Sequence, residues 1–145
     1  MVKKFGPELV INYQTEDIKK IIENKYGKRP INVFYDQVGG EAYEHGIKLL
    51  GSEGRALIVG FASGNRPSQT LSYLLVKNIS IMGVFMISFE NDDRDYLKKR
   101  MELIFDLYIN QQIEPIYKTI KFDEVITYLD LIGSRNTVGR IVALR

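Results

Sequence analysis

Small and polar side chains gather at the ends of two apolar runs. Residues 36–40 (DQVGG) follow the first run and residues 60–64 (GFASG) close the second. Glycine lets a backbone approach a bound molecule closely, and Gln37 and Ser63 supply hydrogen-bonding groups. Because ligands collect where the strands of a parallel sheet end, the pattern predicts a ligand-binding edge.

Residues that could suggest a metal site, a ribose site or a catalytic group have simpler structural explanations. His45 is the single histidine and the chain has no cysteine, so we expect a solvent-facing histidine and no metal site. Asp36 could bind a ribose, but capping of the next helix is the favoured interpretation. The acidic run 90–95 (ENDDRD) lacks the glycine and closing glutamate of an EF-hand and is typical of a helix start. No Ser-His-Asp arrangement or carboxylate pair stands out.

A strand-helix-strand unit must hold the two polar ends together. The runs Ile31–Tyr35 and Ala56–Phe61 are typical of strands covered on both faces. Apolar side chains recur between them at helical spacing, at Tyr43, Ile47 and Leu50. Gly51 and Gly54 are expected to end this helix. Parallel strands joined by a helix require a right-handed crossover.

The flanking segments continue the alternation. Leu9–Tyr13 is predicted as a buried strand, followed by a helix capped by Thr15. The buried face of that helix is expected to comprise Ile18, Ile21, Ile22 and Tyr26. A short helix or turn at Leu71–Lys77 precedes a third strand, Ile79–Met86, in which Gly83 suggests a bulge or a close approach.

The carboxyl-terminal third begins with the longest helix, after the acidic run. An extended segment, 113–121, then leads to a helix at Asp123–Ile132 and a last strand at Arg140–Arg145. The inward side chains of that helix are predicted to be Val125, Ile126, Leu129 and Ile132.

Composition indicates one ordinary globular domain without an internal linker: 145 residues, 45% hydrophobic and 26% charged. The net charge of +2 comes from 20 basic and 18 acidic residues spread along the chain, which gives no reason to expect nucleic acid as a partner. No apolar stretch is long enough to span a bilayer, and the amino terminus is unlike a signal peptide. A cytoplasmic location is expected.

Five strings carry a resemblance: LVINY at 9–13, VFYDQVGG at 33–40, LLGSEGRALIVGFASG at 49–64, LLVKNISIMGV at 74–84 and NTVGRIVAL at 136–144. Their order and spacing resemble the carboxy-terminal part of the medium-chain dehydrogenase/reductase superfamily, above all its zinc-free quinone oxidoreductase and enone (prostaglandin-type) reductase branch. The resemblance implies a Rossmann-type domain and hydride transfer from NADPH to a quinone or an α,β-unsaturated carbonyl.

The resemblance also predicts an unusual fold, an α/β partial Rossmann-type parallel sheet lacking its first two strands and Gly-rich turn. No G-x-G-x-x-G pattern follows a predicted strand, so NADPH binding is expected to be weak or absent in this chain. Residues 1–145 would be the carboxy-terminal part of a nucleotide-binding domain, with 113–145 returning toward a catalytic domain. Ile31–Met86 would form a contiguous three-stranded core, and Leu9–Tyr13 would be displaced, repaired by a partner chain or loosely held.

By the same resemblance, Tyr13 would lie against the adenosine 2′-phosphate, although a tyrosine ending a buried strand is an equal interpretation. Gln37 takes the place of a polar residue that touches the cofactor. The backbone of Phe61, Ala62 and Ser63 would pass the nicotinamide ribose.

At the next strand end, the backbone of Val84, Phe85 and Met86 would contact the carboxamide, although a β-bulge also explains this segment. Asn136 would lie near the nicotinamide, although an asparagine in a turn needs no ligand.

Three functional hypotheses follow. The first is a fragment of an NADPH-dependent quinone or enone oxidoreductase, with a small-molecule substrate and no catalytic competence alone. The second is a non-catalytic module that forms a homodimer through the edge strand 79–86. The third is another doubly wound domain, such as a methyltransferase that binds S-adenosylmethionine.

Overall fold

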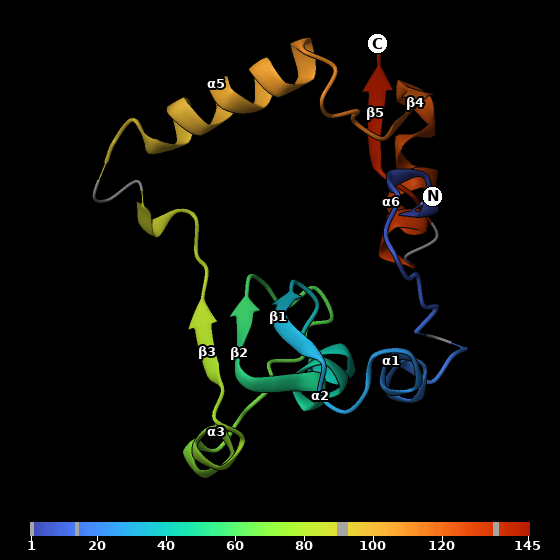
Figure 1. Cartoon of the computed structure of the whole chain (residues 1–145). Coiled ribbons are helices and arrows are strands. Elements are labelled where there is room, and N and C mark those ends of the chain that lie inside the picture. The colour runs from blue at the N-terminus through green and yellow to red at the C-terminus, as the bar shows by residue number, and fades with distance from the viewer. Residues whose placement is uncertain (1, 14, 90–92, 135–136) are drawn as a thin grey trace. The chain divides into compact units, whose positions relative to one another are not determined.

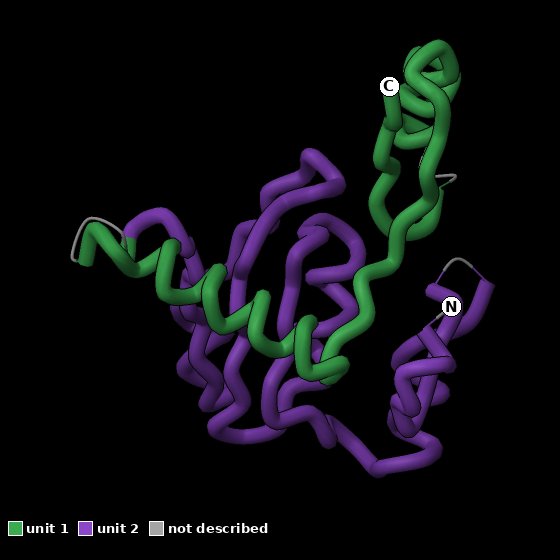
Figure 2. The backbone as a smooth tube through the Cα atoms, turned by 90° about the horizontal axis from the view of Figure 1, so that it is seen from above, with its two compact units in different colours: residues 1, 89–145 green, residues 2–88 purple. Residues whose placement is uncertain are grey.

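The computed structural model describes residues 2–13, 15–89, 93–134 and 137–145. The chain divides into two compact units, residues 2–88 and, toward the carboxyl end, residues 89–145 (Figure 2). The boundary follows the third strand, where the sequence shows no linker. Whether residues 113–145 return toward a catalytic domain stays a prediction.

The first unit contains a three-stranded parallel sheet in the order β1-β2-β3 (Figure 1). Its strands and the helices between them are β1 (Ile31–Asp36), α2 (Gly40–Leu49), β2 (Leu50–Ile58), α3 (Leu71–Lys77) and β3 (Ser80–Gly83). The predicted parallel core is therefore confirmed, and the fold is α/β, consistent with part of a Rossmann-type sheet.

The hydrophobic core lies between α2 and one face of this sheet. Tyr43 and Ile47 of α2 pack with Leu50 and Ala56 of β2, and all four are buried. Phe34 of β1 packs against this cluster. Each fully buried large apolar side chain contributes about 1.5–3 kcal/mol, so this contact supplies much of the stability of the unit.

The opposite face of the sheet is open, and the expectation of strands covered on both faces is wrong. Side chains alternate between the two faces of a strand, so Val33 and Tyr35 point away from the core. They are 47% and 60% exposed, and Met82 of β3 is 53% exposed. The continuous apolar runs therefore predicted the strands correctly, but they did not predict that one face of the sheet is exposed.

Helix α2 ends at Leu49, before the glycines that were expected to end it. Leu50 already has extended backbone and pairs with Ile31 of β1. The register then shifts, and Val33 pairs with Arg55. Strand β2 is bent (Figure 1), and Gly51 and Gly54 belong to the part of it between these two pairs. The strand consequently starts before the predicted Ala56–Phe61 run and ends three residues short of Phe61.

The amino-terminal part contains η1 (Val2–Phe5), a short 3-10 helix, and α1 (Ile18–Tyr26). The cap of α1 is Asp17 and not Thr15, because the Asp17 carboxylate accepts the N–H of Lys20 at 3.0 Å. The helix ends at its C-cap, Gly27. The predicted buried strand at Leu9–Tyr13 is wrong. No strand of the described residues pairs with this irregular segment, in which Tyr13 is exposed.

The second unit holds its own parallel pair of strands. Its elements are α5 (Tyr96–Ile109), β4 (Tyr117–Lys121), η2 (Phe122–Glu124), α6 (Val125–Gly133) and β5 (Arg140–Leu144). The predicted long helix and last strand are confirmed. The predicted inward face of α6 is wrong for Ile126, Leu129 and Ile132, which are exposed, because a two-stranded sheet offers a helix little surface.

Candidate functional site

The carboxyl ends of β1 and β2 lie side by side, as the polar ends of the two runs predict. The chain continues the strand pairing past both strands through three main-chain bonds. Asp36 accepts the N–H of Val59 at 2.8 Å, Gln37 that of Ala62 at 3.1 Å and Val38 that of Ser63 at 2.9 Å. We call residues 36–40 and 59–65 the paired tips. Their contact brings Gln37, Phe61, Ala62 and Ser63 to one edge of the sheet.

Glycine makes this close contact possible. Gly39 and Gly40 have φ of +71° and +56°, which is left-handed backbone. A Cβ added to Gly39 would lie 2.6 Å from the carbonyl oxygen of Asn65, and one added to Gly40 would lie 3.1 Å from the hydroxyl of Ser63. The two glycines of DQVGG therefore serve the approach of one tip to the other.

Asp36 is the last residue of β1 and is 2% exposed. Its Oδ1 accepts the N–H groups of Val38 and Gly39 at 2.9 and 3.0 Å, and its Oδ2 accepts that of Gly39 at 3.2 Å. The favoured interpretation as a cap of the next helix is wrong: α2 is capped by Gly39 without a side-chain bond, and the Asp36 carboxylate instead holds the turn that precedes the helix. A carboxylate so engaged and buried is not presented to a ribose hydroxyl.

The third tip follows β3. The N–H of Val84 bonds to the carbonyl of Ile58 at 2.9 Å, which extends the pairing of β2 with β3 by one residue. Phe85 and Met86 are 64% and 59% exposed. The Phe85 carbonyl accepts the N–H and the hydroxyl of Ser88, at 3.1 and 2.7 Å. A Cβ added to Gly83 would meet nothing within 4 Å, so space is open at this strand end.

Two predicted site residues are not placed at this edge. Tyr13 lies in the irregular amino-terminal segment and is 64% exposed. Asn136 lies outside the described residues. The structure thus joins Gln37 with Phe61, Ala62 and Ser63, and it places Tyr13 in a separate irregular segment.

Asn65 belongs to the edge and was missed by sequence reasoning. Its N–H donates to the hydroxyl of Ser63 at 3.2 Å, and its carbonyl is the group nearest to Gly39. Its signal in the sequence is weak, because an asparagine before Arg66 and Pro67 is common in loops.

The pKa of Tyr43, a core residue of α2, is raised. Burial raises the pKa of its phenol, and the nearby Tyr73 and Asp36 raise it further. Tyr43 is therefore neutral at physiological pH and serves as a core side chain of α2.

The described residues offer no metal site. They contain no group of three or more His, Cys, Asp or Glu side chains arranged to hold an ion. His45 is half-buried and lies 3.7 Å from the carboxylate of Glu41, one helical turn away. Residues 93–95 are the described part of the acidic run, and there the carboxylate of Asp93 pairs with Lys99 at 2.8 Å. The residues present do not fit a zinc ion.

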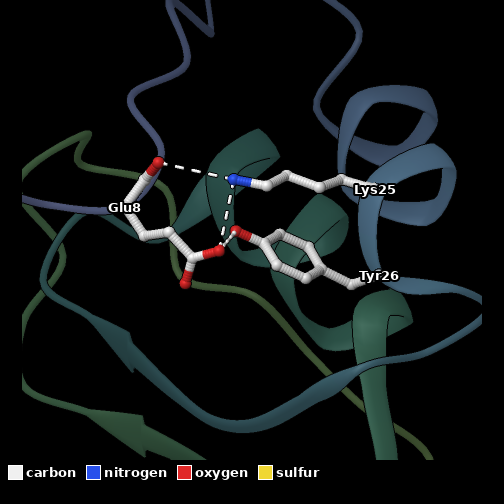
Figure 3. A network of polar contacts seen from close by, with 3 residues as sticks. All are labelled: Glu8, Lys25 and Tyr26. Atoms are coloured by element: carbon white, nitrogen blue, oxygen red, sulfur yellow. Dashed lines mark hydrogen bonds and ion pairs between the residues drawn. The ribbon is translucent and has the colours of Figure 1, made fainter.

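A polar cluster ties the amino-terminal segment to α1 (Figure 3). The carboxylate of Glu8 accepts the Tyr26 hydroxyl at 2.8 Å and pairs with the Lys25 ammonium at 3.2 Å.

Helices long and apolar enough to cross a membrane are absent from the described part of the chain.

Solved structures share this fold over nearly the whole chain. The quinone oxidoreductase of Escherichia coli, crystallised with NADPH, has a TM-score of 0.84 and 22% identity, over 99% of this chain and 45% of that one. The quinone oxidoreductase of Pseudomonas syringae has a TM-score of 0.81 and 20% identity, over 99% and 44%.

Curated relatives agree. Quinone oxidoreductase-like protein 2 of Rattus norvegicus is 27% identical over 94% of this chain and 39% of its own length. Prostaglandin reductase-3 of Mus musculus is 27% identical over 97% of this chain and 41% of its own length. The chain thus spans about two fifths of the length of these relatives. Residues 1–106 match the zinc-binding dehydrogenase family. The chain therefore belongs to this family, as the carboxy-terminal part of a medium-chain dehydrogenase/reductase.

Proposed function

We propose that this chain is the carboxy-terminal cofactor-binding part of an NADPH-dependent oxidoreductase that reduces a quinone or an α,β-unsaturated carbonyl, and that it is inactive alone. The observation that carries the proposal is the pair of bonds from Ala62 and Ser63 to Gln37 and Val38, which align two strand ends at the edge where such sheets bind nucleotides. Relatives named quinone oxidoreductase-like protein and prostaglandin reductase support the reaction class.

The residues present fit one end of the cofactor. Bound NADPH supplies the hydride in enzymes of this kind. The main chain of Phe61, Ala62 and Ser63 would pass the nicotinamide ribose, and Gln37 would offer its amide. Residues 84–86 would line the carboxamide side with apolar side chains. The chain would thereby help to orient the reactive ring.

The other end of the cofactor lacks its usual support. Helix α2 begins after Gly39 without a side-chain cap, but its DQVGGE start is not the G-x-G-x-x-G turn that cradles a pyrophosphate. Tyr13, expected at the adenosine end, lies in the irregular segment before α1. We therefore expect NADPH affinity that is weak or below detection. We also propose a zinc-free reaction, as in the branch of the superfamily that the sequence resembles.

The test has two parts. NADPH is titrated into the full chain, labelled with nitrogen-15, and amide shifts at Ala62, Ser63 and Val84 are followed by NMR, with adenosine as the control ligand. Absorbance at 340 nm then follows NADPH oxidation with a quinone or an enone. We expect small shifts confined to these tips and no turnover. Turnover by this chain would contradict its proposed inactivity, and shifts elsewhere would contradict the proposed edge.

A second candidate is a dimerisation module. Strand β3 is an edge of the sheet, pairs with β2 alone among the described strands, and keeps Met82 exposed. Such an edge is able to pair with a second copy. A homodimer without nucleotide affinity would favour this candidate, whereas a monomer that binds NADPH would favour the first. The family membership makes S-adenosylmethionine a poor third candidate.

A further inference from the structure

Asp36 is the one charged side chain that is buried among the described residues. Burial of a carboxylate is costly unless its oxygens accept hydrogen bonds. Here both oxygens do so, from the main chain of Val38 and Gly39, at 2.9 to 3.2 Å. The buried carboxylate of Asp36 therefore serves to hold the three residues that follow the end of β1.

These bonds shape the first of the paired tips. They turn residues 37–39 back over the carboxylate, and in this conformation the carbonyls of Gln37 and Val38 accept the N–H groups of Ala62 and Ser63. The main-chain carbonyl of Asp36 also holds Val59 at 2.8 Å. One residue therefore contacts both tips, through its side chain on one and its backbone on the other.

We infer that Asp36 is a positioning residue for the candidate cofactor edge. Its carboxylate fixes residues 37–39, and through them the main chain of Ala62 and Ser63, without itself facing the bound molecule. The inference rests on the proposed function for the identity of that molecule. The geometry it concerns is measurable without any nucleotide.

The experiment is amide hydrogen exchange on the full chain, comparing wild type with Asp36→Ala and Asp36→Asn. Loss of the carboxylate should speed exchange at Ala62 and Ser63 by about tenfold or more relative to Leu57 in β2, since roughly one hydrogen bond's worth of restraint is lost. Asp36→Asn keeps the Oδ1 acceptor that serves Val38 and Gly39, so it should restore most of the protection.

The matched control is Asp17→Ala. It removes a comparable bond from a carboxylate to a main-chain N–H, at 3.0 Å in α1, and should leave Ala62 and Ser63 unchanged. If Asp36→Ala speeds exchange equally at Leu57, Ala62 and Ser63, its role is overall stability and the inference is overturned. Should that variant not fold, Asp36→Ser replaces it, because a serine hydroxyl forms a weaker version of the same turn.

NADPH added to the same samples separates the two proposals. Shifts at Ala62 and Ser63 that weaken at least about fivefold in Asp36→Ala and return in Asp36→Asn support the positioning role. Equal shifts in wild type and Asp36→Ala overturn it. A wild-type chain that shows no shift contradicts cofactor binding by this chain alone, and the exchange rates then decide the inference.

Discussion

Two glycines of the paired tips share left-handed backbone but differ in their surroundings. Gly39 has φ +71°, and an added Cβ would lie 2.6 Å from the Asn65 carbonyl oxygen. Gly64 has φ +81° and nothing within 4 Å of that position. Backbone strain costs about 1–2 kcal/mol at either site, whereas the clash at Gly39 adds about 1–3 kcal/mol. The edge therefore depends on Gly39 for space and on Gly64 for conformation alone.

We expect Gly39→Ala to lower the free energy of unfolding by about 2–5 kcal/mol and Gly64→Ala by about 1–2 kcal/mol. Urea unfolding followed by circular dichroism measures both. Equal losses would show that the contact between Gly39 and Asn65 relaxes without cost, and the close apposition of the tips would then be less rigid than the distances indicate.

The Glu8 cluster makes a prediction about pH (Figure 3). The Tyr26 hydroxyl, and then Lys25, lower the pKa of Glu8. Tyr26, and then Glu8, raise the pKa of Lys25. The Glu8 contribution is therefore fully present above the ordinary glutamate pKa and is lost as pH falls through its lowered pKa. The Lys25 contribution is present below the ordinary lysine pKa and is lost as pH rises through its raised pKa.

Because all three side chains are exposed, the effect should be local. We expect the ring signals of Tyr26 to shift on acidification with the lowered pKa of Glu8, and this step to vanish in Glu8→Gln. NMR titration of the tyrosine ring measures it, with Tyr13 as an internal reference. A step that persists in Glu8→Gln would show that Tyr26 senses another group.

At the scale of elements, Arg29 joins the ends of two helices. Its Nε donates to the carbonyl of Leu50, just after α2, at 2.6 Å, and its Nη2 donates to that of Lys77, the last residue of α3, at 2.8 Å. A cation at helix carboxyl ends is favoured by the helix dipole. One planar side chain thereby links both crossover helices at the amino edge of the sheet.

We expect Arg29→Ala to lower the free energy of unfolding by about 1.5–3 kcal/mol, the value of hydrogen bonds from a charged donor. Arg29→Lys should recover less than half, because a single ammonium does not reproduce the two-pronged geometry. Chemical denaturation compares the three proteins. Full recovery by lysine would mean that charge, and not the two directed bonds, holds the helix ends.

Local patterns predicted the elements better than their boundaries. The apolar run from Ile31 and the helix Leu71–Lys77 follow from periodicity and are found as expected. Leu9–Tyr13 has the same apolar character, yet a strand also needs a neighbour for its backbone, and local sequence does not report one. Choosing Asp17 over Thr15 as the cap likewise required knowing where the first turn starts.

The candidate edge was predictable only in part, for a related reason. Glycine and polar residues after two strands foretold that tips 36–40 and 59–65 meet, because parallel topology brings such ends together. The partners of Asp36 and the contact of Asn65 with Gly39 depend on the conformation of two loops. Residue types alone do not predict that conformation. The expected roles of Tyr13 and Asn136 stay predictions.

At the scale of the whole molecule, exposed apolar side chains are the dominant surface feature. In the first unit they lie on the open face of the sheet, at Val33, Tyr35 and Met82, and on α3, where Leu71 and Leu75 are both 82% exposed. A chain that spans about two fifths of its relatives' length would leave such surfaces uncovered. Two of these surfaces give a test of how copies of the chain associate.

Substitutions on strand β3 and on helix α3 should affect association between copies of the chain differently. If copies pair through the sheet edge, a lysine on β3 should oppose pairing, because charged side chains protect exposed edges. We therefore expect Met82→Lys to shift the chain from dimer toward monomer, whereas Leu75→Lys, at a still more exposed apolar position, leaves the dimer intact. Light scattering over a concentration series measures both, and circular dichroism checks that each variant is folded.

Because Met82 points to the open face and Ile81 to the core, the Met82→Lys substitution leaves the packing of α2 undisturbed. Equal loss of the dimer in both variants would mean that the copies associate through apolar surface in general, and the edge would then have no special part in it.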